Sequence, residues 1–321
     1  MMLQIAMIGT WHVHFKGYAE DISKRKDCRI TVIWDHDEAR AKEAARTFGC
    51  DYETDYGKVL AREDVQAVAV TSETSLHPDL LIKAAEAGKH IFTEKVLCFT
   101  SADAQRIRRA VAESGVRFCI SFPWRCKAEY LYTKQVVDSG LLGQITYARV
   151  RNAHDGASAG WLPDTFYDPV SCGGGAMMDL GAHPMYLLLD LFGTPEAVTS
   201  FFTSVCGKRV EDNAVSILEY GGMIASSETG FVSANCPFTL EISGTKGCLI
   251  WGGAAGKLML DTGAGMTQPA LGAPLKEPVD QWADAILYGG EIRFGIDDAV
   301  ELTRLMEKAY ESSRARQRAA F

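Results

Sequence analysis

The sequence has little of what would mark a secreted, membrane-spanning or nucleic-acid-binding protein. Its nine cysteines include no CxxC pair, so neither a thiol redox motif nor a zinc site is indicated. It has no apolar run of membrane-spanning length, and we expect no signal peptide. Basic residues are not in excess, because 33 Lys and Arg face 41 Asp and Glu for a net charge of -8. We therefore expect a reduced, cytoplasmic chain whose partner is a small molecule and neither nucleic acid nor a membrane.

What is present indicates two domains of different texture. The 321 residues are 47% hydrophobic and 23% charged, as in an ordinary globular protein. Strands alternate with short helices up to about residue 121, which predicts a Rossmann-type parallel α/β domain at 1–122. Strand-like runs dominate from about residue 144, which predicts an α+β domain with a largely antiparallel sheet at 123–321. In one alternative, the carboxyl-terminal helix of this second domain packs back on the first domain.

The second strand ends in an acid that is typical of dinucleotide-binding folds. Asp35 follows Gly9 at about the interval of a carboxylate that accepts hydrogen bonds from the adenosine ribose. No arginine comes immediately after it, so the sequence predicts NAD rather than NADP. The alternative is a helix cap, because Asp37 and Glu38 beside it open a helix.

The phosphate-binding loop is irregular. Only the first glycine of GxGxxG survives in Gly9-Thr10-Trp11-His12-Val13-His14, so the motif alone is weak evidence for a nucleotide. His12 or His14 could donate a hydrogen bond to the phosphates in place of the amides of the missing glycines. A metal site at this His-x-His pair is the alternative. We expect none, because the sequence offers no acid or cysteine cluster nearby.

An acid and a histidine stand four residues apart in GGGAMMDLGAHPMYLLLDLFG at 173–193. On a helix this spacing puts Asp179 and His183 on one face, where the carboxylate would orient the imidazole as a general base. The alternative is a histidine of the core. Pro184 predicts that the helix either begins near this point or kinks between the two residues.

Several segments together resemble one known family. Glu94-Lys95 closes AGKHIFTEK, GGGAMMDLGAH follows later, and DVQAVAVTSETSLHPDLLIKAAEAGKH, EDNAVSILEY and ISGTKGCLIW are similar to its recurring segments. The chain thus resembles the glucose-fructose oxidoreductase and inositol dehydrogenase (Gfo/Idh/MocA) family over nearly its whole length. The resemblance implies hydride transfer between NAD or NADP and sugars or polyols, and a homodimer or homotetramer formed through the carboxyl-terminal sheet.

The resemblance also implies roles for individual residues. The catalytic group would be Lys95, Asp179 and His183. From the glycine loop and the ends of the predicted strands, we expect the cofactor to be bound by Gly9, Trp11, His12, Asp35, Thr71, His77, Glu94 and Lys95. Other segments could reach a sugar or polyol, through Arg125, His154, Asp155, Trp161 and Tyr167.

The chain departs from the family's pattern in three places. Trp11 and His14 replace glycines, Val96 replaces the proline after the lysine, and Tyr186 stands where many members have a second acid. A cis bond before a non-proline residue costs about 2.5 to 4 kcal/mol, so we predict a trans Lys95–Val96 peptide. Two alternatives stay open. One is a glycoside-cleaving enzyme that uses the same chemistry and retains NAD. The other, which the altered glycine loop favours, is a non-catalytic regulator that responds to sugars or nucleotides.

Overall fold

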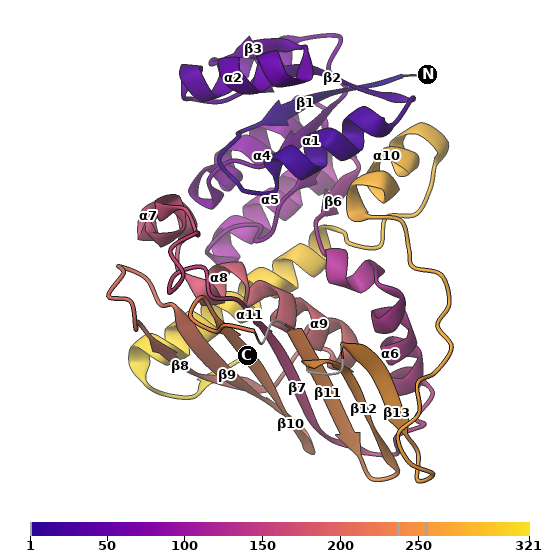
Figure 1. Ribbon diagram of the computed structural model, residues 1–321. Helices are drawn as coiled ribbons and strands as arrows, with labels where there is room; N and C mark the ends of the chain where they lie inside the picture. Colours follow the sequence, from indigo (N-terminus) through magenta and orange to yellow (C-terminus); the bar gives the residue numbers. More distant parts are fainter. Residues whose placement is uncertain (1, 236–237, 254–255) are drawn as a thin grey trace. The chain divides into compact units, whose positions relative to one another are not determined.

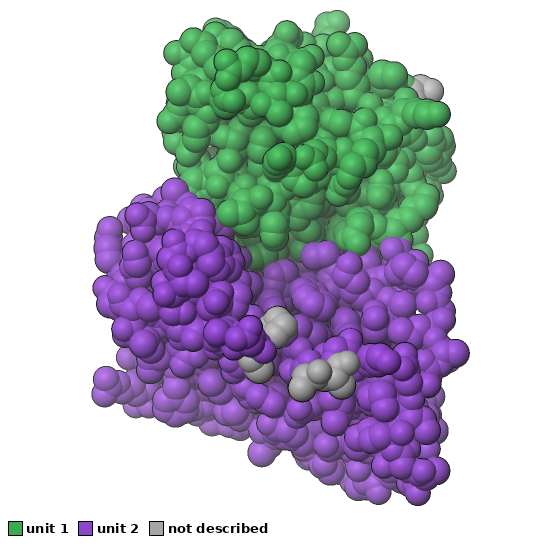
Figure 2. Space-filling model, in the orientation of Figure 1, with its two compact units in different colours: residues 1–121, 276–303 green, residues 122–275, 304–321 purple. Residues whose placement is uncertain are grey.

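The computed structural model describes residues 2–235, 238–253 and 256–321. The chain forms two compact units, coloured separately in Figure 2. Unit 1 comprises Met1–Ser121 and Lys276–Thr303, and unit 2 comprises Phe122–Leu275 and Arg304–Phe321. The first unit is therefore discontinuous in sequence, whereas the sequence analysis divided the chain once, between residues 122 and 123.

Unit 1 is built on a six-stranded parallel sheet (Figure 1). Its strand order is β3-β2-β1-β4-β5-β6, and every neighbouring pair is parallel. This order reverses direction between β1 and β4, which is the switch point at which such sheets bind ligands. The strands are β1 (Leu3–Ile8), β2 (Cys28–Trp34), β3 (Asp51–Glu53), β4 (Ala67–Val70), β5 (His90–Thr93) and β6 (Phe118–Ile120).

Helices cover this sheet, and local signals set their ends. Asp37 caps α2 by accepting from the backbone N–H groups of Ala39 and Arg40, and Gly49 ends it in the left-handed region at φ 65°. Helices α4 and α5 pack on each other, and α1 packs on α10. The helices of unit 1 are α1 (Phe15–Lys24), α2 (Glu38–Phe48), α3 (Tyr56–Ala61), α4 (His77–Glu86), α5 (Ser101–Ser114) and α10 (Pro278–Tyr288), with the short 3-10 helix η1 (Thr74–Leu76).

The second stretch of unit 1, Lys276–Thr303, is part of the core of this unit. Trp282 of α10 is fully buried, and its ring centroid lies 5.8 Å from that of Phe92 in β5. Arg25, after α1, forms ion pairs with Asp280 at 2.9 Å and Asp284 at 2.7 Å. Residues far apart in sequence therefore hold this unit together.

Unit 2 contains an eight-stranded sheet with the order β13-β12-β11-β7-β10-β9-β8-β14 (Figure 1). All neighbouring pairs are antiparallel except β7 with β10. The predicted fold class is therefore confirmed for both sheets. The strands are β7 (Ile145–Ala153), β8 (Ala197–Thr203), β9 (Asn213–Tyr220), β10 (Met223–Gly230), β11 (Phe238–Gly244), β12 (Gly247–Gly252), β13 (Lys257–Asp261) and β14 (Ala319–Ala320).

Helices pack on one face of this sheet. The alternating burial along β9 shows that only one of its faces is covered. Contacts of α8 with β9 and β10, and of α9 with β7 and β10, provide part of that cover. The helical segments are η2 (Pro123–Cys126), α6 (Ala128–Asp138), η3 (Asp164–Tyr167), α7 (Pro169–Cys172), α8 (Ala176–Asp179), α9 (Ala182–Phe192) and α11 (Ile296–Ala315), of which residues 304–315 count with unit 2.

No helix in the described ranges combines the length and the apolar character that crossing a bilayer requires.

Candidate functional site

The loop after β1 begins with a glycine that no other residue can replace without movement. Gly9 has φ 83°, and a Cβ atom there would lie 2.4 Å from Cα of Ser72. The N–H of Gly9 donates to the carbonyl of Trp34 at 2.7 Å, and the carbonyl of Gly9 accepts from the Thr71 hydroxyl at 2.6 Å. Gly9 thus joins the carboxyl ends of β1, β2 and β4. This close approach is what a dinucleotide loop demands of its first glycine.

Behind this loop, two histidines meet a buried glutamate. Nδ1 of His14 lies 3.3 Å from Oε1 of Glu94, and the rings of His12 and His14 are 4.7 Å apart. Tyr18 donates a short hydrogen bond to Oε2 of Glu94 and lies 2.6 Å from Oγ of Ser121. Burial raises the pKa of the Glu94 carboxyl. The charges of His14 and His12, the hydrogen bond to His14 and the charge of Lys95 lower it, and together they hold this pKa well below its usual range.

The structure supplies the acid that the sequence analysis found missing. Ligand atoms of His12, His14 and Glu94 all lie within 4.8 Å of one another, so the three residues form a group that could hold a metal ion. However, Nδ1 of His12 accepts the backbone N–H of His14 at 3.2 Å. When the ring is neutral, this bond places its proton on Nε2, which suits donation to an anion better than ligation of a cation. Trp11 lies beside this group, with its ring 5.9 Å from that of His12.

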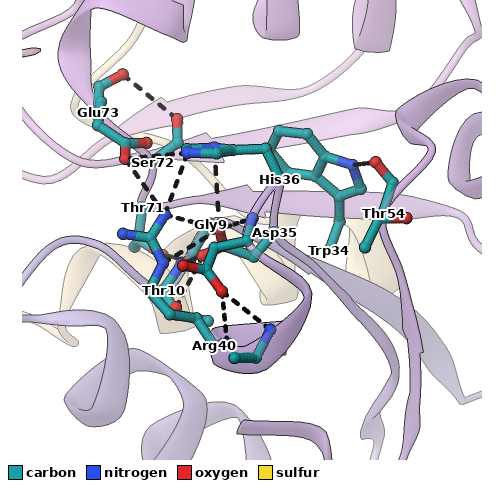
Figure 3. A network of polar contacts seen from close by, with 12 residues as sticks. Gly9, Thr10, Trp34, Asp35, His36, Arg40, Thr54, Thr71, Ser72 and Glu73 are labelled. Carbon is teal, nitrogen blue, oxygen red and sulfur yellow. Dashed lines mark hydrogen bonds and ion pairs between the residues drawn. The ribbon is translucent and has the colours of Figure 1, made fainter. Parts of the chain in front are cut away.

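Asp35, the acid predicted to bind the ribose, is buried and fully engaged (Figure 3). Its Oδ2 accepts from the backbone N–H of Thr10 at 2.9 Å and from the Thr10 hydroxyl at 2.8 Å. Its Oδ1 accepts from the N–H of Asp37 at 2.9 Å and from two nitrogens of Arg40 at 3.2 and 2.7 Å. Burial raises the pKa of the Asp35 carboxyl, but the bonds from Arg40, Asp37 and Thr10 outweigh burial and lower it overall.

Arg40 links this acid to a second one (Figure 3). One of its terminal nitrogens also lies 3.3 Å from Oε1 of Glu73, on the loop after β4. Nε2 of His36 lies 3.8 Å from the same oxygen. The other carboxylate oxygen of Glu73 is buried and has no hydrogen-bond partner within the described part of the chain. The segments that follow β2 and β4 therefore bring together two acids, Asp35 and Glu73, with Arg40 and His36.

Lys95 follows β5 and is buried, with 4% of its surface exposed. Its peptide bond to Val96 is cis, so the prediction of a trans bond was wrong. That prediction used the cost of a cis bond in an isolated peptide, whereas this segment is buried and held by tertiary contacts. Nδ1 of His77 lies 3.1 Å from the Val96 carbonyl and 3.2 Å from that of Leu97. His77 thus supports the backbone that carries Lys95.

In unit 2, the segment at 173–193 forms two helices. Helix α8 ends at Asp179 and α9 begins at Ala182, so the predicted interruption between Asp179 and His183 is confirmed. Pro184 lies in the first turn of α9, where its missing N–H leaves no helical bond unmade. The two residues therefore do not share one continuous helix face, as the four-residue spacing assumed.

His183 is buried and has a tyrosine as a close partner. Its Nδ1 lies 2.9 Å from Oη of Tyr186, one turn further along α9. The same oxygen accepts the backbone N–H of Trp124 at 3.3 Å, and the Tyr186 ring stacks on Phe122 with centroids 4.2 Å apart. A hydroxyl both donates and accepts, so Tyr186 can hold either neutral tautomer of the imidazole. The charge of Asp179 acts on His154, whose pKa is lowered by burial and raised in part by that charge.

Arg125, a predicted substrate residue, is tied to an acid of α9. Its guanidinium lies 2.6 Å from Oδ1 of Asp190, and the Tyr130 hydroxyl donates to the other oxygen of Asp190 at 2.5 Å. Burial, together with Asp190, raises the pKa of Tyr130 well above its usual range. Asp190 of α9 therefore holds Arg125, and Tyr130 of α6 holds Asp190.

Three other predicted substrate residues share the loop after β7. The Trp161 ring lies 4.6 Å from that of His154, and its indole N–H donates to Asp155 at 3.0 Å. His154 also stacks on Phe231 with centroids 5.1 Å apart. Tyr167 is buried in the neighbouring apolar cluster that includes Phe231, and Nζ of Lys208 lies 4.3 Å above its ring.

Some functional candidates escaped the sequence analysis. Arg40 and Glu73 carried no motif, although Glu73 lies between the predicted cofactor residues Thr71 and His77. Tyr18 and Asp190 looked like ordinary helix residues. Their partners Glu94 and Arg125 are 76 and 65 residues away in the chain.

Comparison with known proteins gives matches over both units. The pattern described as the oxidoreductase family, NAD-binding Rossmann fold, matches residues 3–122, and the GFO/IDH/MocA C-terminal domain matches residues 130–250. dTDP-3,4-didehydro-2,6-dideoxy-alpha-D-glucose 3-reductase of Streptomyces violaceoruber is 28% identical over 260 residues, covering 81% of this chain and 72% of the relative. Inositol 2-dehydrogenase of Rhizobium meliloti is 24% identical, covering 84% and 82%. Levoglucosan dehydrogenase in complex with NADH and levoglucosan superposes with a TM-score of 0.87 at 20% identity, covering 100% of this chain and 99% of the other.

Proposed function

The chain belongs to the GFO/IDH/MocA family of oxidoreductases, and from this premise we propose that it transfers hydride between NAD(H) and a secondary alcohol of a sugar, sugar derivative or polyol. The substrate class is supported by two relatives, an inositol dehydrogenase and a reductase of a nucleotide-linked sugar. We assign dinucleotide binding to unit 1 and substrate binding to unit 2.

The loops of unit 1 fit a dinucleotide. Gly9 leaves no room for a side chain where the backbone must come close to the pyrophosphate. His12 replaces one of the missing glycines with an imidazole, and Glu73 offers a buried oxygen that has no hydrogen-bond partner among the described residues. When bound, the nicotinamide supplies or accepts the hydride, and the protein provides orientation and acid-base groups.

His183 is the proposed acid-base residue. Oxidation of an alcohol requires a group that takes the hydroxyl proton, and reduction requires one that returns it. Tyr186 contacts Nδ1 of His183, and we assign the proton transfer to Nε2. Asp179 is proposed to favour the protonated imidazole through its negative charge. The single observation that carries this assignment is the buried, tyrosine-held imidazole at the start of α9.

Lys95 is proposed to orient the hydroxyl and to stabilise the negative charge that develops on its oxygen. It lies at the carboxyl end of a parallel strand, the edge at which such sheets bind ligands. His77 fixes the backbone that follows it through two carbonyl contacts. The substrate's other hydroxyls are assigned to Arg125, His154 and Asp155, with Trp161 and Tyr167 as apolar surfaces.

We also propose a homo-oligomer formed through the outer face of the unit 2 sheet. Phe201, Tyr147 and Ile224 are exposed on β8, β7 and β10, and Tyr147 and Ile224 are paired neighbours on one face. Light scattering should give a multiple of 35.1 kDa, and Ile224→Glu should shift the protein toward the monomer. A cytoplasmic setting is supported by the eight cysteines in the described ranges, all of which are free.

The test of the function uses purified protein, NAD and a panel of sugars, inositols and their keto forms. Turnover is followed by the absorbance of NADH, and released products are identified by mass spectrometry. NADH formation with a polyol or sugar supports the proposal. Product formation without net NADH would instead favour a glycoside-cleaving enzyme that retains NAD. Failure to bind any nicotinamide dinucleotide would refute both.

A further inference from the structure

Asp35 has no free capacity for a ribose hydroxyl. Its two oxygens receive five hydrogen bonds, from two Thr10 donors, the Asp37 amide and two Arg40 nitrogens. Two carboxylate oxygens offer about four lone-pair sites, so the acceptor is saturated. The residue is also 0% exposed. A ribose could reach it only by displacing Arg40 or Thr10.

Glu73, unlike Asp35, has an oxygen that can accept a further hydrogen bond. Its Oε1 faces Arg40 at 3.3 Å and His36 at 3.8 Å, while its Oε2 is buried without a partner in the described part of the chain. A buried carboxylate oxygen without a donor is unfavourable, and such groups in native proteins call for a missing partner. Glu73 follows β4, whose carboxyl end borders the switch point beside β1.

The charges around these residues do not cancel. Arg40 contacts both acids, so one positive charge serves two carboxylates, and His36 adds a charge only when protonated. Because Asp35 takes two nitrogens of Arg40 and Glu73 takes one at a longer distance, the uncompensated negative charge resides mainly on Glu73. A phosphate group placed there would be repelled, whereas a hydroxyl would find an acceptor.

We propose that Glu73, and not Asp35, accepts the adenosine ribose 2'-hydroxyl of NAD and discriminates against the 2'-phosphate of NADP. Asp35 is a positioning residue that fixes Thr10 and Arg40 at the ends of β1 and β2. The proposal rests on the proposed NAD-dependent function and assigns the discrimination to a residue that the strand-end acid rule does not select.

Isothermal titration of NAD and NADP into three full-length variants tests the assignment. Glu73→Gln removes the charge and keeps the shape, so we expect NAD to bind roughly tenfold more weakly and the ratio of NAD to NADP affinity to fall by at least that factor. Asp35→Asn loosens the loop, so both dinucleotides should weaken alike and their ratio should stay. Glu43→Gln, on the exposed face of the same helix as Arg40, removes one charge elsewhere and should change neither.

Glu73→Asp keeps the negative charge but shortens the side chain by one methylene. This variant replaces Glu73→Gln in the test if Glu73→Gln does not fold. It should weaken NAD while NADP stays excluded. The proposal is overturned if Asp35→Asn abolishes discrimination, or if the Glu73 variants weaken both dinucleotides equally. If the unaltered protein binds neither dinucleotide, the proposed function fails as well, so the two failures are distinguishable.

Discussion

Replacing Tyr186 by Phe removes the hydroxyl that contacts His183 and keeps the aromatic ring. The ring is 1% exposed and stacks on Phe122 at 4.2 Å and an interplanar angle of 20°, and phenylalanine preserves both burial and stacking. The variant loses the 2.9 Å contact with Nδ1 of His183 and leaves the Trp124 amide without this acceptor. It therefore separates the orientation of the imidazole from its presence.

The magnitudes follow from these contacts. A neutral hydrogen bond contributes about 1 kcal/mol net, so a catalytic step that depends on the held ring should slow about fivefold. Removal of the imidazole itself in His183→Ala should slow turnover by roughly 100- to 10,000-fold, the usual contribution of general acid-base catalysis. Because both changes act through one group, the double variant should be no slower than His183→Ala.

The assay is steady-state NADH formation at saturating NAD with the best substrate from the panel, measured across pH. Dinucleotide binding, followed separately by titration, should be nearly unchanged in all three variants. Unimpaired turnover of His183→Ala would refute the catalytic assignment. A Tyr186→Phe defect as large as that of His183→Ala would refute the orienting role, because it would mean that the tyrosine is itself the acid-base group.

Other predictions concern unit 1 and the acid of α8. Asp179→Asn should reduce turnover less than His183→Ala, since the imidazole remains, and a comparison of kcat values checks this. Lys95→Met should lower kcat while the Kd for NAD, from titration, stays within about twofold. The pKa of Glu94 in the folded protein lies below its value in the unfolded chain. The ionised carboxylate therefore stabilises the fold above about pH 4.3, and this stabilisation is lost as the pH falls further. Glu94→Gln lacks this contribution, so the difference between its urea midpoints at pH 7 and pH 4 should be smaller than in the unaltered protein. Gly9→Ala should destabilise the protein by about 2 to 4 kcal/mol in urea unfolding, because of its positive φ and the clash with the backbone after β4.

The fold was largely predictable because its signals are local. Buried strands bounded by glycines, such as the one before Gly9, and helices ended by Gly49 or Gly115 carry their own boundaries. The short β3 and α3 and the two-residue β14 carry no such signal, since segments of this length have too few residues to show a period.

The site was predictable only at single positions. Strand ends and motifs singled out Asp35, Lys95 and His183 as candidates, but they gave no indication of the partners of these residues. Spacing gives no sign that Glu94 would meet His14, from which it is separated by 80 residues. The cis bond after Lys95 likewise runs against the local rule for a non-proline residue.

The discontinuity of unit 1 has a consequence for synthesis on the ribosome. Trp282 and the partners of Arg25 are translated only after nearly all of unit 2 has been made. Residues 1–121 must therefore leave the exit tunnel with the surface over β5 and β6 still uncovered, whereas most of unit 2 can fold as it emerges. The dinucleotide-binding half begins the chain and should be the last to mature. In a nascent-chain protease experiment, chains halted before residue 276 should stay cleavable within 1–121, and chains released after residue 303 should resist.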